Sequence, residues 1–166
     1  MDLEAIRLAW ESGEMDGAAR SIYDALPTPL RPSWAADILE LACSCLREVP
    51  REVRSVVDIG RSPMRHREAH DAFSAVRDLT LVEDETNAGG AMYSAILVTA
   101  ENAAKTIYNG SGVKEPIKRG EKAPFDEECG YWLVECLSYL ARLNGSPAFK
   151  SRAWNLLENW LHRASK

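Results

Sequence analysis

The chain has 166 residues, of which 46% are hydrophobic and 27% are charged, and five of them are tryptophans. That length suits one domain with a sizeable core, and that composition excludes disorder of the whole chain. The formal net charge of −5 disfavours binding to nucleic acid, because an acidic surface repels the phosphate backbone. We therefore expect a single domain over residues 1–166 that folds by itself.

The first residues of the chain and its apolar runs lead to an expectation about the protein's location in the cell. Residues 1–4 carry no basic stretch followed by an apolar run, which a secretory signal needs. The longest apolar run, over residues 91–100, is too short to cross a bilayer. We expect a cytoplasmic protein without a membrane span. Its four cysteines are then expected to be reduced and buried in helices: Cys43, Cys45, Cys129 and Cys136.

Apolar residues recur at helical spacing in nearly every segment, and Pro or Gly separates the segments. This pattern predicts an all-α fold, a single-domain bundle of about seven helices paired as antiparallel αα-hairpins, with no significant sheet. In chain order, helical patterns cover residues 2–12, 15–26, 33–48, 50–59, 63–81, about 88–108, about 126–144 and 147–160.

Two segments that are longer than the other breaks lack the helical pattern. Pro27, Pro29 and Pro32 forbid a continuing helix, so residues 27–32 are expected to form an extended connector. Residues 109–124 hold Gly, Pro and alternating charge without periodicity, which predicts a mobile loop.

Two acidic triplets are expected to mark the starts of helices. Residues 83–85 precede the helix that ends near Tyr108, and residues 126–128 precede the next one. Carboxylates are favourable beside the positive end of a helix dipole. We expect both triplets to have this structural role.

Residues 13–26 resemble the turn and second helix of a tetratricopeptide repeat. Gly13 lies in the turn, Ala18 and Ala19 come early in the following helix, and Tyr23 lies near its middle. The resemblance covers one hairpin, and the position 34 residues after Gly13 is Arg47, in a different pattern. No array follows, so the family's ligand groove is not implied, and a generic αα-hairpin is the favoured interpretation.

His66 and His70 lie at i and i+4, a spacing that can place two imidazoles beside one metal ion. The residue after His66 is not the glutamate that a zinc-protease helix needs, and Arg65 and Arg67 would repel a dication. We favour a solvated polar turn and expect neither a metal nor a cofactor.

Arginines gather between residues 47 and 67, among interleaved carboxylates that are expected to form surface ion pairs with them. An acidic partner protein is a likelier target for this segment than a phosphate or RNA. The candidate partner-binding residues are Arg51, Arg54, Arg61 and Arg65.

Asn102 falls on or beside the apolar face of the helix over residues 88–108, and Glu101 can pair with Lys105 one turn later. A buried amide needs hydrogen bonds, so Asn102 either locks a helix crossing, which we favour, or lines a pocket. The candidate ligand-binding residues are Asn102, Glu101, Tyr108, Lys118 and Arg119.

The sequence offers no catalytic set, since it lacks a nucleophile elbow and a phosphate-binding loop. We expect a non-enzymatic module that binds another protein, such as an adaptor, an inhibitor or an immunity-type protein. Its acidic surface suits a basic partner, and its aromatic residues exceed what a core needs: Trp10, Trp34, Tyr131, Trp132 and Trp154. The alternative is a small helical enzyme or a domain that binds an anionic ligand near Asn102, under a lid formed by residues 110–124.

Overall fold

The computed structural model describes residues 1–114 and 118–166, and every regular element in that part of the chain is helical. The all-α fold predicted from the sequence is confirmed. The eight α-helices are α1 (Leu3–Ser12), α2 (Asp16–Ala25), α3 (Arg31–Cys43), α4 (Arg51–Gly60), α5 (Ala69–Thr86), α6 (Gly90–Asn109), α7 (Glu128–Asn144) and α8 (Pro147–Ala164), with short 3₁₀ helices η1 (Thr28–Leu30) and η2 (Pro63–Glu68).

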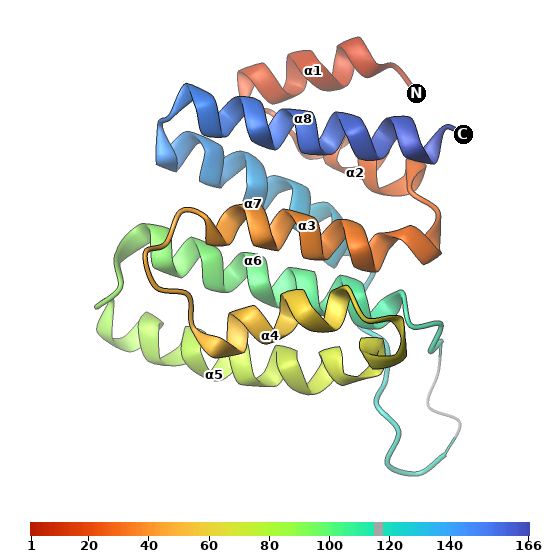
Figure 1. The fold of residues 1–166 in the computed structure, drawn as a ribbon, viewed down its shortest axis with the longest axis vertical. Coiled ribbons are helices and arrows are strands. Elements are labelled where there is room, and N and C mark those ends of the chain that lie inside the picture. Colours follow the sequence, from red (N-terminus) through yellow and green to blue (C-terminus); the bar gives the residue numbers. More distant parts are fainter. Residues whose placement is uncertain (115–117) are drawn as a thin grey trace.

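The helices lie side by side and are stacked along the long axis of the molecule (Figure 1). Helices α1 and α8 lie at one end of the stack, and α4 and α5 lie at the other. Helix α6 is at the centre, where it packs against α3, α4, α5 and α7. Its fully buried side chains include several alanines, which let the neighbouring helices approach closely: Ile96, Leu97, Ala100, Ala103, Ala104 and Ile107.

The first acidic triplet lies elsewhere than expected. Helix α5 continues through residues 83–85 to Thr86, so these carboxylates belong to its last turns and do not begin α6. Glu83 nevertheless reaches the start of α6, because both of its carboxylate oxygens accept a hydrogen bond from the Gly89 N–H at 3.0 Å. The hydroxyl of Ser94 donates to the same carboxylate at 3.3 Å. Glu83 thus joins the end of one helix to the beginning of the next.

The connector over residues 27–32, expected to be extended, instead contains η1 and the beginning of α3. Pro29 and Pro32 each lie in the first turn of a helix, where the missing N–H is not needed. Helix α3 ends at Cys43, earlier than the expected Glu48. The expected helix over 63–81 is divided into η2 and α5.

A close contact between α2 and α7 positions the first turn of α7. A Cβ atom added to Gly130 would lie 2.1 Å from Cε2 of Tyr23, so no larger residue fits without movement of the ring. Gly13 ends α1 in the left-handed conformation, with φ of 78°. The resulting turn, Gly13–Met15, faces α7.

We predict that Glu83→Ala lowers the free energy of unfolding by about 1–3 kcal/mol, because it removes the hydrogen bonds that this buried carboxylate accepts from the Gly89 N–H and the Ser94 hydroxyl. Glu83 is only 5% exposed. Urea unfolding measures the change. The matched control is Glu85→Ala, an exposed position in the same triplet, which should change stability by less than about 0.5 kcal/mol. Equal effects of the two substitutions would contradict the assigned role of Glu83.

Candidate functional site

Asn102 lies in the crossing of α6 and α7. Its side-chain amide donates to the Val98 carbonyl at 3.0 Å and approaches the Cys136 sulfur at 3.8 Å. One turn later the Thr106 hydroxyl lies 3.7 Å from the Cys129 sulfur. Both amide contacts are therefore made inside the crossing, with groups of these two helices.

Glu101 lies on another side of α6 and faces α5. It is buried, and its carboxylate pairs with the Arg77 guanidinium at 3.4 Å. The expected ion pair between Glu101 and Lys105 is wrong, because Arg77 of the neighbouring helix α5 supplies the cation instead. The Lys105 ammonium lies 5.0 Å from the ring centre of Phe73 instead.

Tyr108 is buried near the end of α6, and its hydroxyl donates to the Lys122 carbonyl at 2.7 Å. Lys118 and Arg119 are exposed on the same loop. Residues 115–117, which belong to the loop expected to be mobile, lie outside the described residues. The five residues expected to bind a ligand thus face different neighbours, and the structure does not bring them together.

The arginine-rich segment is exposed or partly exposed, and its candidate residues pair with carboxylates. Three of the four contact a carboxylate of a different turn or helix, so their positive charge is largely offset locally. The pairs are Arg51 with Glu52 at 3.2 Å, Arg54 with Glu40 at 3.6 Å, Arg61 with Asp37 at 3.2 Å and also with Glu40, and Arg65 with Glu68 at 3.0 Å.

His66 and His70 belong to different elements. His66 lies in η2, with its Nε2 atom 3.2 Å from the Gly60 carbonyl oxygen, whereas the His70 ring stacks on Phe125 at 4.4 Å between ring centres. Within residues 1–114 and 118–166, no three His, Cys, Asp or Glu side chains are grouped so that they could hold a metal ion.

All four cysteines are free, and burial raises the pKa of each thiol. The pKa rises to about 11 for Cys43 and for Cys136. Thiols with such values stay protonated at neutral pH and are poor nucleophiles.

The outward side of α7 carries exposed apolar side chains. Trp132, Tyr139 and Leu143 are 54%, 48% and 37% exposed, and spacings of seven and four place them on one side of the helix. We call these three residues the α7 face. The other tryptophans are buried, and Tyr131 packs edge-on against Tyr23 at 5.2 Å between ring centres. Of the aromatic residues expected to exceed the needs of the core, Trp132 is the most exposed.

Val98 is a further exposed apolar residue, on the neighbouring helix α6, one turn before Asn102. Asn102 touches Cys136, which lies between Trp132 and Tyr139 on α7. Exposed apolar side chains therefore occur on both of these adjacent helices.

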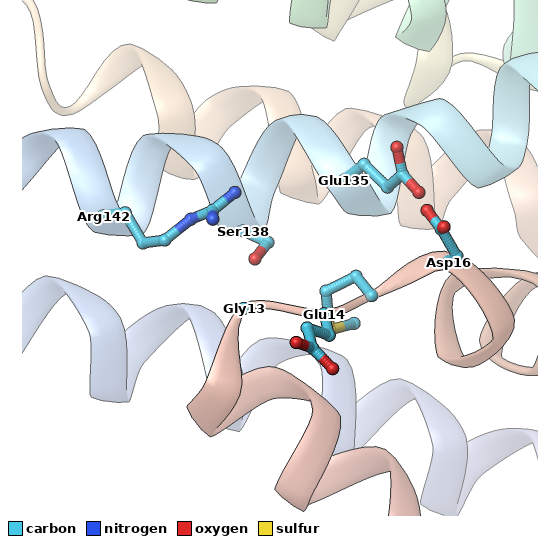
Figure 2. Close-up of a pocket in the computed structure, with 7 residues that line it drawn as sticks. Gly13, Glu14, Asp16, Glu135, Ser138 and Arg142 are labelled. Carbon is cyan, nitrogen blue, oxygen red and sulfur yellow. The ribbon is translucent and has the colours of Figure 1, made fainter.

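A polar cleft adjoins the α7 face and separates α7 from the turn between α1 and α2 (Figure 2). Its volume of about 580 Å³ is within the range of small-ligand sites. Three carboxylates and one guanidinium line it, which leaves an excess of two negative charges when all are ionised. The lining residues are Gly13, Glu14, Met15, Asp16, Glu135, Ser138 and Arg142.

Two carboxyl groups meet at one end of the cleft. Figure 2 shows the side chains of Asp16, from α2, and Glu135, from α7, directed toward each other. Burial, and then hydrogen bonding and charge repulsion from Asp16, raise the pKa of Glu135 above its ordinary value of 4.5. The pair therefore holds a proton more readily than separate carboxylates would.

Ser138 lies between the carboxyl pair and Arg142 in the cleft (Figure 2). It is only 3% exposed, and its hydroxyl points into the cleft. Unlike many Ser and Thr hydroxyls of this protein, it forms no hydrogen bond with any described residue. The hydroxyl is therefore open to a group that enters the cleft.

The sequence did not single out the cleft residues of α7. Glu135, Ser138 and Arg142 lie at i, i+3 and i+7, so the sequence does place them on one side of the helix. Their partner surface, the turn Gly13–Met15 with Asp16, is far away in the chain. Only the packing of α2 on α7 brings the two surfaces together.

No helix in the described part of the chain has both the length and the apolar character required to cross a bilayer. The chain matches no known family model, no curated protein and no solved structure.

We predict that Glu135→Gln stabilises the protein at neutral pH. Because the pKa of Glu135 is higher in the folded than in the unfolded state, ionisation opposes folding above that pKa. The gain should disappear as the pH falls below about 4.5, where the group is protonated in both states. Urea unfolding at neutral and at acidic pH measures the difference.

The control for this prediction is Glu48→Gln, which makes the same change at an exposed position between α3 and α4. It should alter stability little at either pH. A loss of stability in Glu135→Gln at neutral pH would show that the carboxylate is favourable where it lies.

Proposed function

We propose that this protein is a non-enzymatic module that binds another protein, of the adaptor, inhibitor or immunity type, and that it docks through the α7 face. The exposure of Trp132 carries this proposal, since the four other tryptophans are buried. Trp and Tyr are enriched in protein interfaces and in their energetic hot spots. Tyr139 and Leu143 on the same side of α7, and Val98 on α6, add further exposed apolar area.

The partner that best fits this surface is a segment with both apolar and basic side chains. Glu128 is exposed one turn before Trp132 on α7, and the cleft beside the face adds Glu14, Asp16 and Glu135. The whole chain carries a net charge of −5. An amphipathic helix with lysines beside its apolar stripe would complement both properties.

The other functions considered have less support. The arginine segment is an unfavourable nucleic-acid surface, because its candidate residues pair with carboxylates. An enzyme or a ligand site around Asn102 is disfavoured because that amide is bonded within the helix crossing.

We also propose that the module works in the cytoplasm. Its four cysteines are free, and a reducing compartment keeps thiols in that state.

The test uses a synthetic 18-residue peptide with leucine and lysine at helical spacing. We predict that it binds the full chain and shifts the fluorescence emission of Trp132 to shorter wavelength, because its apolar stripe removes water from that ring. The same peptide with glutamate in place of lysine should not bind.

Tyr139→Ser combined with Leu143→Ser should weaken peptide binding about tenfold or more, measured by calorimetry. Both side chains are exposed, so the fold should persist. The matched control is Met64→Ser, an exposed apolar residue in η2 that lies outside the α7 face. The docking proposal fails if the acidic peptide binds as well, if the double variant binds unchanged, or if sedimentation shows that a second copy of this chain covers the face.

A further inference from the structure

The cleft beside the α7 face is lined by three side chains that can accept hydrogen bonds. Glu135 and Ser138 lie one turn apart on α7, and Asp16 lies opposite Glu135 on α2 (Figure 2). The two carboxylates accept hydrogen bonds, and the hydroxyl can also accept one. A primary ammonium group has three N–H donors, no acceptor and a positive charge, so it complements a cleft with this lining.

Two observations indicate that the cleft can receive a polar ligand. Ser138 is only 3% exposed, and its hydroxyl points into the cleft and forms no hydrogen bond within the described chain, so a group in the cleft can bond it. The carboxyls of Asp16 and Glu135 are directed toward each other, with no cation between them in the described residues. Carboxylates that face each other repel when both are ionised, and an ammonium group placed beside them would offset that repulsion.

We propose that the cleft binds the primary ammonium group of a lysine side chain, which a partner inserts when it docks on the α7 face. This inference rests on the proposed function for the source of the lysine. The four-carbon stem of lysine can lie against the buried Met15, which also lines the cleft, while its ammonium group reaches the acceptors.

The position of Arg142 makes the two ends of the cleft electrostatically different. It lies on the other side of Ser138 from Glu135, so the ammonium group belongs at the end formed by Asp16 and Glu135 (Figure 2). At that end the carboxylates are nearest, and repulsion by the guanidinium is weakest. Arg142→Ala removes this repulsion and should raise the affinity for lysine severalfold.

Protons and lysine should compete for the same carboxyl groups. The charged groups that line the cleft with Glu135 are Glu14 and Asp16 on the opposite wall and Arg142 on α7 itself. Because the pKa of Glu135 is raised, the pair takes up a proton as the solution is acidified, and the protonated pair attracts a cation less. Lysine binding should therefore weaken as the pH falls.

The first experiment tests the cleft alone, with Nα-acetyl-lysine methylamide titrated into the full chain and followed by NMR. We expect the amide signals of Glu135 and Ser138 to shift, and no shift with the norleucine analogue, which lacks the ammonium group. Glu135→Gln should weaken lysine binding about tenfold, and Glu48→Gln should leave it unchanged. Equal shifts with the two analogues would overturn the ammonium site.

Ser138→Ala tests whether the Ser138 hydroxyl contributes to lysine binding or to the stability of the fold. If the hydroxyl serves the site, its removal should weaken lysine binding severalfold while stability stays unchanged, because the hydroxyl forms no hydrogen bond with a described residue. A loss of stability with unchanged lysine binding would assign the hydroxyl to the fold and contradict the proposal.

The second experiment tests whether a peptide that docks on the α7 face places one of its lysines in the cleft. Each lysine of the leucine and lysine peptide is replaced in turn by norleucine, in the wild-type chain and in Glu135→Gln. We expect one of these replacements to lower the affinity of the peptide about tenfold for the wild-type chain and less than twofold for Glu135→Gln. Such a difference would show that the replaced lysine and Glu135 are in contact. If the peptide binds but no replacement depends on Glu135, the ammonium inference fails and the docking function stands. If the lysine amide binds but the peptide does not, the docking function fails.

Discussion

Helix α6 lies at the centre of the bundle, where buried side chains such as Ala100, Ala103 and Ile107 pack against α3, α4, α5 and α7. Its start lies at the exposed end of the α5–α6 hairpin. There the buried carboxylate of Glu83, from the end of α5, accepts hydrogen bonds from the Gly89 N–H and the Ser94 hydroxyl. One carboxylate thus links the two helices of the hairpin, and α3, α4 and α7 pack on α6.

Polar side chains lie in different settings on the two sides of α7. Toward α6, the Asn102 amide is bonded to the Val98 carbonyl and lies against the Cys136 sulfur, so its hydrogen bonds are made inside the helix crossing. Toward the turn after α1, the Ser138 hydroxyl has no hydrogen bond within the described chain and points into the cleft, where two carboxyls also face each other. The first arrangement is what a stable crossing needs. The second leaves polar groups open to the cleft, beside the exposed apolar side chains of the α7 face.

The helices could be predicted from the sequence because apolar spacing and terminal residues are local signals. The start of α7 follows from the carboxylates at 126–128, and the start of α8 from Ser146 and Pro147. Pairings between helices could not be predicted in this way, because Arg77 and Asp16 are not neighbours in sequence of the groups they contact. The five tryptophans also look alike in sequence. Which side of α7 faces the core, and hence the exposure of Trp132, depends on tertiary packing.

The contact between Gly130 and Tyr23 has a consequence for how the cleft would operate. With no space for even a methyl group between the α7 backbone and this ring, α2 cannot slide along α7 without displacing the ring from a filled core. The two walls of the cleft are therefore held at a fixed separation before any ligand arrives. A preorganised cleft of this kind loses little conformational entropy on binding, and its selectivity comes from rejecting groups of the wrong size and not from closing around them.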